Sequence, residues 1–94
     1  MSDIPPISEP ESVLAFPTEF PIKVIGLTQH GFAQAVVEVV KRHAPDYDPA
    51  SLGIRKSREG KYLSLTCTIL ATSREQLDAL YQELCDHPMV KMVL

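Results

Sequence analysis

Residues 62–71 are predicted to form a strand, and its first eight residues alternate strictly between hydroxyl-bearing and apolar side chains. The apolar set is Leu63, Leu65, Cys67 and Ile69, and the other set is Tyr62, Ser64, Thr66 and Thr68. Successive side chains of a strand point to opposite faces, so this pattern predicts an antiparallel sheet with one buried face and one open face. The rest of the chain must therefore cover only one side of that sheet.

Two amphipathic stretches can provide this cover. The first runs from Phe32 to His43 and ends before Pro45, and its stripe consists of Phe32, Val36, Val39, Val40 and His43. Cations in its last turn, Lys41, Arg42 and His43, are explained by the negative end of the helix dipole. The second begins at two overlapping capping boxes and carries Leu77, Leu80, Tyr81 and Leu84 on its apolar side. These boxes are Thr72-x-x-Glu75 and Ser73-x-x-Gln76.

Three further segments complete the predicted sheet. Residues 20–27 are β-branched and apolar, and residues 51–57 form a weaker strand joined to residues 62–71 by a turn at Gly60. Residues 89–94 close the chain as a strand, with Val90, Met92 and Leu94 facing inward and Lys91 outward. The order β-α-β-β-α-β predicts an α+β, ferredoxin-like sandwich: a four-stranded antiparallel sheet with two helices on one face.

Charge and proline content separate the first residues from the rest. Residues 1–21 hold five of the eight prolines and four acids without a lysine or arginine, while the whole chain has a net charge of −3. We expect residues 1–12 to be a disordered, proline-rich acidic tail and residues 13–94 to form a single domain. Asp3 and the early prolines argue against a secretory signal, and no apolar run is long enough for a membrane span. We therefore expect a cytoplasmic protein that does not contact a membrane.

The cysteines and histidines predict neither a metal site nor a cofactor. Cys67 and Cys85 are far apart without a Cys-x-x-Cys pair, and Cys85-x-His87 is the only close pairing of cysteine with histidine. A tetrahedral zinc site needs four converging ligands, which this spacing does not offer. We expect two reduced, buried thiols that pack as small apolar groups, with a disulfide or a redox role as the alternative.

Several strings of residues in the body of the chain recur together in one family. They are Phe16-Pro17-Thr18 followed by Phe20, Lys23-Val24-Ile25-Gly26, Val36-Val37-Glu38-Val39-Val40 with Arg42-His43-Ala44-Pro45, Gly60-Lys61-Tyr62-Leu63-Ser64, and Val90-Lys91-Met92-Val93-Leu94. In combination they resemble the YbeD family, small bacterial proteins of unassigned biochemical function. The resemblance covers about residues 14–94.

This resemblance implies a ferredoxin-like fold similar to the ACT regulatory domains, which bind amino acids beside metabolic enzymes. Family members tend to lie near lipoate-attachment genes, which implies a regulatory link to lipoate metabolism. The family defines no catalytic residues, so none is carried over. The proline-rich start and residues 27–31 depart from the family pattern, and this leaves the specificity for a ligand open.

The connection between the first strand and the first helix is one candidate site. ACT-like domains bind ligands there, through backbone donors and a glycine that permits close approach. The corresponding residues are Gly26, Leu27, Thr28, His30 and Gly31. The adjoining helix N-terminus suits a carboxylate, so we expect a small carboxylic-acid metabolite as effector. The alternative is that both glycines are ordinary turn glycines.

The open face of the sheet is the second candidate, as a surface for a protein partner or a homodimer. Its predicted residues are Lys23, Ile25, Tyr62, Ser64, Thr66, Thr68 and Lys91. A sheet edge or face in so small a domain is a ready surface for pairing. The alternative is a solvated face, which antiparallel sheets tolerate.

RNA binding and catalysis are the weaker hypotheses. An RNA-binding sheet stacks bases on several aromatic side chains, and here only Tyr62 is in place, although Arg55, Lys56, Arg58 and Lys61 surround the turn. No nucleophile has a base and an orienting group at a recognisable spacing. Acylphosphatases share this fold and use an arginine and an asparagine, and this chain has no asparagine. We therefore expect a non-enzymatic regulatory or adaptor domain that does not bind nucleic acid.

Overall fold

The computed structural model describes residues 15–94, so the predicted acidic tail over residues 1–12 lies outside the described residues. Within them the predicted order β-α-β-β-α-β is confirmed. The elements are β1 (Thr18–Leu27), α2 (Phe32–His43), β2 (Gly53–Lys56), β3 (Tyr62–Ala71), α3 (Arg74–Asp86) and β4 (Met92–Val93), with a 3₁₀ turn at Pro49–Ser51 before β2.

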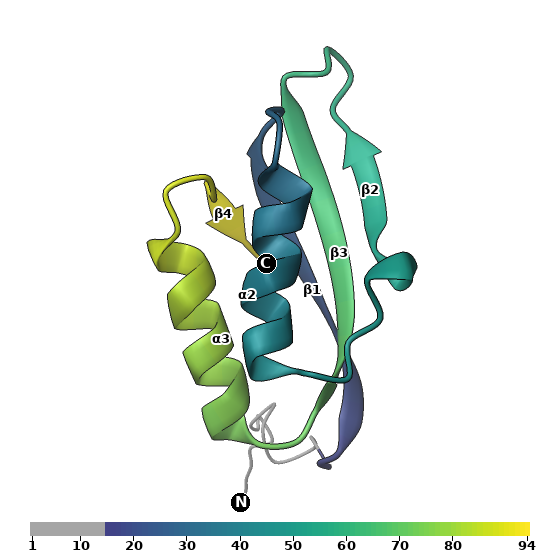
Figure 1. Ribbon diagram of the computed structural model, residues 1–94, viewed down its shortest axis with the longest axis vertical. Coiled ribbons are helices and arrows are strands. Elements are labelled where there is room, and N and C mark those ends of the chain that lie inside the picture. Colours follow the sequence, from purple (N-terminus) through teal and green to yellow (C-terminus); the bar gives the residue numbers. More distant parts are fainter. Residues whose placement is uncertain (1–14) are drawn as a thin grey trace, which may run out of the picture.

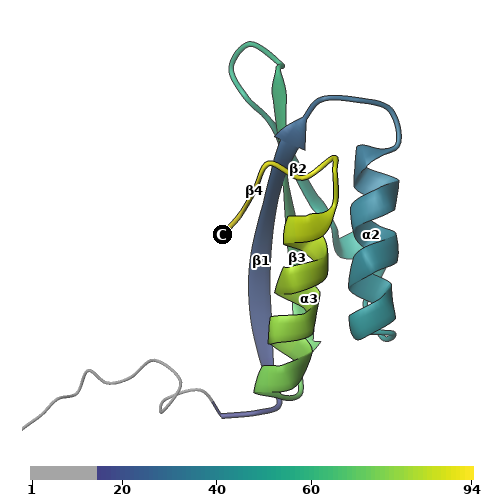
Figure 2. The same cartoon turned by 90° about the vertical axis from the view of Figure 1, so that its left-hand side faces the viewer.

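The four strands form one antiparallel sheet in the order β2-β3-β1-β4. Both helices pack on the same face, and Figure 2 shows the sheet as one layer and the helices as a second. The other face of the sheet is covered by no described element, and we call it the open face. The predicted α+β, ferredoxin-like sandwich is thus confirmed.

The core lies between the sheet and the helices, as the two periodicities predict. Inward residues of β1 and β3 are buried: Ile22, Val24, Leu65, Cys67, Ile69 and Ala71. They meet the apolar stripes of α2 and α3, which are formed by Phe32, Val36, Val39, Val40, Leu77, Leu80 and Leu84. Ten residues of β1 pair with ten of β3, which makes these two strands the centre of the sheet.

Of the two overlapping capping boxes, the second one begins α3. The Ser73 hydroxyl accepts a hydrogen bond from the Gln76 amide at 3.0 Å, and the Gln76 side-chain oxygen accepts one from the Thr72 amide at 2.7 Å. Two backbone donors at the helix start are satisfied in this way. The position of Ser73 therefore fixes where the helix begins.

The closing strand differs from its prediction in length and in the face of its side chains. It comprises only Met92 and Val93, and Val93 lies opposite Val24 and packs against the core. Met92 and Leu94 are exposed by 51% and 61%, so the predicted inward orientation of both is wrong. Met92, Val93 and Leu94 are all apolar, so no polar residue in this segment indicates which of them face inward.

The weak strand before the turn is also shorter than predicted, because Ser51 belongs to the 3₁₀ turn. Asp48 accepts a hydrogen bond from the Ala50 amide at 3.0 Å and so caps this turn. Pro49 occupies its first position, where a missing N–H costs nothing. The strand begins only at Gly53, and Gly60 adopts the positive φ of 77° expected in the hairpin turn.

Candidate functional site

The open face is built from side chains that strand register aligns in rows. One row runs across all four strands as Arg55, Ser64, Ile25 and Met92. The next row contains Gly53, Thr66 and Lys23, and Leu94 exchanges two backbone hydrogen bonds with Lys23. Residues that pair across an antiparallel sheet share a face, so these rows lie on one surface.

Apolar side chains occupy more of this surface than the sequence analysis anticipated. Tyr62, Leu70, Met92 and Leu94 are all exposed large apolar residues, and the register places each of them on the open face. Ile25 and Leu27 are partly exposed between them. The strand β4 thus adds apolar area to the open face.

Charges on the open face are mostly positive. Lys23 and Arg55 lie in its two central rows, and the Lys61 ammonium lies 5.6 Å from the centre of the Tyr62 ring. Glu19 lies opposite Leu70 at the far end of the sheet. The middle of the open face therefore combines aliphatic side chains with positive charge.

Six of the seven residues predicted for this surface are brought together by the register of β1 and β3. The seventh, Lys91, precedes β4, and Met92 takes the place beside Ile25. Four further residues lie on the open face and were not predicted for it: Arg55, Leu70, Met92 and Leu94. Arg55 and Leu70 could have been found by carrying the period of two to the strand ends, whereas Met92 and Leu94 required the register of β4.

The strand-to-helix connection, residues 26–31, lies at one end of the sheet in Figure 1. A Cβ atom at Gly26 would come within 2.4 Å of the Met89 carbonyl oxygen and 2.6 Å of the Phe32 ring. The Thr28 amide donates to the Lys61 carbonyl at 2.8 Å. Packing therefore explains Gly26, and the amide of Thr28 is already bonded within the protein.

The remaining part of this connection is the start of α2. Gly31 stands at the N-cap with a φ of 85°, makes no side-chain capping bond, and is followed by a first turn without an acidic residue. His30 is exposed beside it. Of the five residues predicted for a carboxylate site, Gly31 is the N-cap of α2 and His30 is the exposed residue that precedes it.

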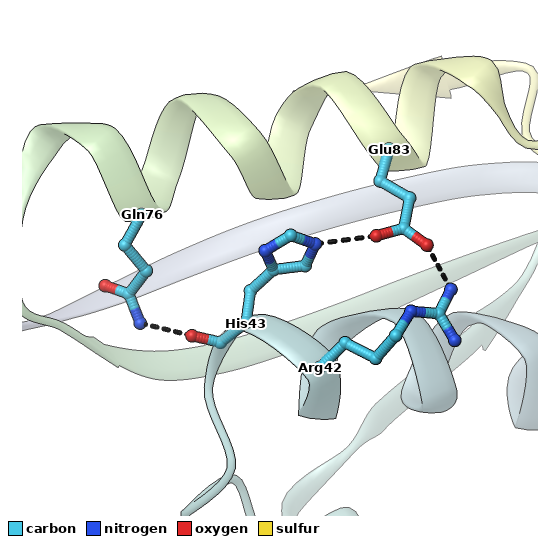
Figure 3. Close-up of polar contacts among 4 residues, drawn as sticks. All are labelled: Arg42, His43, Gln76 and Glu83. Atoms are coloured by element: carbon cyan, nitrogen blue, oxygen red, sulfur yellow. Dashed lines mark hydrogen bonds and ion pairs between the residues drawn. The ribbon is translucent and has the colours of Figure 1, made fainter.

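A polar cluster joins the two helices, and Figure 3 shows its four residues. The Arg42 guanidinium donates to one Glu83 oxygen, and the His43 Nε2 lies 2.6 Å from the other. Gln76 donates to the His43 carbonyl at 2.8 Å. The hydrogen bond from Arg42, and then the one from His43, holds the pKa of Glu83 below its usual range. The cations at the end of α2 therefore also bond to α3.

The two cysteines are free thiols in different surroundings. Cys67 is fully buried, and burial raises the pKa of its thiol. Cys85 is exposed, so its predicted burial is wrong; it follows Leu84 by one residue and is rotated off the apolar stripe. No group of three metal-ligating side chains gathers within residues 15–94, and no helix described there is long and apolar enough to span a membrane.

Solved structures with a similar fold include an ACT domain. A solution structure of a protein from H. pylori superposes with a TM-score of 0.71 at 14% identity and covers 100% of this chain and 98% of that one. The ACT domain from GTP pyrophosphokinase of Chlorobium tepidum superposes with a TM-score of 0.60 at 17% identity, covering 81% of this chain and 84% of that one. At such identities these likenesses show the fold, which is ACT-like.

Sequence relatives place the chain in a family. The UPF0250 protein of Nitrosomonas europaea is 60% identical over 84 residues, which are 89% of this chain and 97% of that protein. The UPF0250 protein of Bordetella pertussis is 52% identical over the full length of both. A family described as "Protein of unknown function (DUF493)" matches residues 11–94. The resemblance to YbeD proteins is confirmed: the chain belongs to the UPF0250 family of bacterial proteins, with the DUF493 domain.

Proposed function

We propose that this chain is a non-enzymatic adaptor or regulatory domain that binds a partner protein on the open face of its sheet. The observation that carries this proposal is the set of exposed aliphatic side chains around Lys23 and Arg55, on the side that no described element covers. Solvated antiparallel faces usually carry polar side chains, and exposed apolar groups that lie together mark interaction surfaces.

The charges of the open face favour one kind of partner. Lys23, Arg55 and Lys61 would be complemented by an acidic segment, and Ile25, Met92 and Leu94 by apolar side chains of that segment. A second copy bound face to face would place positive charge against positive charge. RNA would need further aromatic rings beside Tyr62, and aliphatic side chains offer no such stacking. An acidic, amphipathic segment of another protein is the best match.

A small carboxylic acid at the start of α2 is the second candidate. It is favoured by the N-cap Gly31, which supplies no side-chain capping bond, and by the lack of an acid in the first turn. An amide NMR titration with amino acids, lipoate and octanoate tests it. Localised shifts at Gly31, Ala33 and Gln34 would support an effector site, and a silent panel would remove it.

Photocrosslinking in cells tests the proposed partner surface. Benzoylphenylalanine in place of Met92 should give one discrete protein adduct, whereas the same group in place of Gln82, which is exposed on α3, should not. Lys23→Glu should abolish that adduct. Arg58→Glu is the matched charge reversal in the hairpin turn and should preserve it.

Four outcomes would contradict the proposal, and three of them concern the identity of the adduct. They are an adduct of this chain with itself, an adduct removed by ribonuclease, and the same adducts from positions 92 and 82. An adduct that survives Lys23→Glu would also contradict it, because the positive charge would then play no part. For a discrete adduct, amide shifts of the labelled chain with the purified partner should map to β1, β3 and β4.

A further inference from the structure

The strand β3 is much longer than its neighbour β2. Ten residues of β3 pair with β1, but β2 pairs only with residues 63–66. Figure 1 shows β2 beside one half of β3; on that same side of the other half runs the connection between α2 and β2, which is not a strand. The second half of β3, from Cys67 to Ala71, is therefore a sheet edge.

Hydrogen-bond geometry fixes which backbone groups face this edge. Lys23 exchanges both of its backbone hydrogen bonds with Leu94, so its backbone points toward β4 and away from β3. Its partner Thr66 must then point its own backbone toward β2, because opposed residues alternate between bonded and non-bonded pairs. Because this orientation repeats every two residues, the N–H and C=O groups of Thr68 and Leu70 also point away from β1, within the plane of the sheet. No described strand pairs with them there.

The sheet has another open edge, and it is protected against pairing. The first half of β1 extends beyond β4, which pairs only with Val24 and Ile25. Pro21 lies in that half, on the set of residues whose backbone faces the β4 side. Proline has no N–H to donate and is a common protection of sheet edges. The edge of β3 carries no such proline.

A cleft of about 420 Å³ lies against the edge of β3. Its walls are Thr68–Leu70 on one side and the segment from His43 to Asp48 with Ser51 on the other, and Glu19, Thr72 and Gln76 complete it. Three of the lining residues, Glu19, Asp46 and Asp48, are acidic, and none of the described residues that line the cleft is a lysine or arginine. Among the described residues, the space beside the backbone groups of Thr68 and Leu70 is therefore a cleft, and it carries negative charge.

We propose that an extended peptide segment with lysine or arginine side chains adds to the sheet at this edge, antiparallel to β3 and in line with β2. Its backbone would pair with Thr68 and Leu70, and its basic side chains would lie near Glu19, Asp46 and Asp48. Main-chain hydrogen bonds supply affinity in such strand addition, and side chains supply specificity. This site is separate from the central rows of the open face and prefers a partner of the opposite charge.

The test is an amide NMR titration of the labelled full chain with a defined peptide. The probe is acetyl-Thr-Val-Lys-Val-Arg-Val-Thr-amide. We expect saturable shifts centred on Thr68 and Leu70, together with slower hydrogen exchange of these two amides. The same peptide N-methylated at every residue has lost every backbone N–H donor except its terminal carboxamide and should give no such shifts.

Variants separate the contribution of charge from that of the edge. Asp46→Asn and Glu19→Gln should each weaken binding about two- to fivefold, as expected for an exposed ion pair. Glu59→Gln, the same kind of change in the exposed hairpin turn, should leave the affinity unchanged. Leu70→Pro should abolish binding, because it removes an N–H that points to the edge while the ladder with β1 is kept.

Several results would overturn the proposal. The absence of shifts at Thr68 and Leu70 up to millimolar peptide is one, and equal binding of the N-methylated peptide is another. A further titration uses arginine amide in place of the peptide. If it reproduces the peptide's shifts with the same affinity, the cleft is a site for small cations and no strand is added. If both acidic variants bind as tightly as the unchanged chain, the expected basic partner is wrong.

Discussion

At the residue scale, Gly26 is explained by packing, and its replacement is a sharp test. Gly26→Ala would place a methyl group against the Met89 carbonyl and the Phe32 ring, and the carbonyl belongs to the backbone. We expect the free energy of unfolding to fall by about 1–3 kcal/mol, the usual cost of overpacking. Chemical denaturation measures it. Gly53→Ala is the control, because its nearest contact would be an ordinary 3.5 Å to Thr66; equal loss in both variants would contradict this explanation.

Tyr47 carries a polar group that the fold leaves unsatisfied. Its hydroxyl is buried near the Ser51 and Cys67 side chains, but no atom of the described residues meets it at hydrogen-bonding geometry, and burial raises its pKa. Removing a buried polar atom that has no partner recovers its desolvation cost, so Tyr47→Phe should increase the free energy of unfolding by about 1 kcal/mol. The comparison is Tyr81→Phe, which removes a 3.4 Å hydrogen bond to the Leu94 carbonyl and should not stabilise. A clear loss of stability in Tyr47→Phe would mean that the hydroxyl is bonded in solution.

At the element scale, the contact between α2 and α3 should depend on pH through Glu83. Its pKa in the folded protein lies below the ordinary value of 4.5, because Arg42 and then His43 bond its carboxylate. Such a group stabilises the fold above its unfolded pKa, and this contribution is lost as the pH falls through the folded pKa. We therefore expect Glu83→Gln to lower the melting temperature at pH 7.

The effect of Glu83→Gln should shrink as the pH falls below about 4.5, where the carboxylate of the unchanged chain also becomes protonated. Thermal unfolding of both proteins at a series of pH values measures this. Glu59→Gln in the hairpin turn serves as the control for a general change of charge. A gap in melting temperature that stays constant from pH 7 to pH 3 would show that Glu83 acts through packing alone.

The bounds and the buried face of an element were predictable from the sequence where polar residues occupy its other face. They were not predictable where all its residues are apolar. The stripe of α2 and the alternation of β3 gave their bounds, because each apolar residue has polar neighbours in register. In β4 three successive apolar residues allow either face, and only pairing with Val24 selects Val93. The start of β2 depends on Asp48 capping a 3₁₀ turn, a local competitor that periodicity does not detect.

The candidate sites were predictable to the extent that they follow strand parity. Lys23, Ser64 and Thr66 share the open face as the alternation indicates. The edge of β3 could not be predicted, because the alternation of its side chains is the same whether or not a strand lies beside it. Pairing length is a property of the assembled sheet. It depends here on where β2 begins, which the local sequence did not give correctly.

At the scale of the whole molecule, the sheet has a long centre and short flanks. The β1–β3 ladder pairs ten residues, whereas β2 contributes four and β4 two. The helices bury the inner face of β1 and β3. The packing of these two strands therefore does not require β2 and β4 to extend along their full length. Stretches of the two central strands are thereby left with backbone groups that no described strand pairs. On β1 this stretch contains Pro21, which protects it, whereas the stretch on β3 contains no proline.

Hydrogen exchange of the free protein reports this arrangement directly. Along β3 the amides of Cys67 and Ile69 point into the ladder with β1, whereas those of Thr68 and Leu70 point to the open edge. We expect the amides of Cys67 and Ile69 to exchange more slowly than those of Thr68 and Leu70, by a factor of about ten or more. Amides at an open edge need no local unfolding to exchange. Ser64 and Thr66, whose backbones face β2, provide the internal comparison and should exchange more slowly than Thr68 and Leu70. If all four even-numbered amides are equally protected, the edge is covered in solution, and a peptide strand has no place to add.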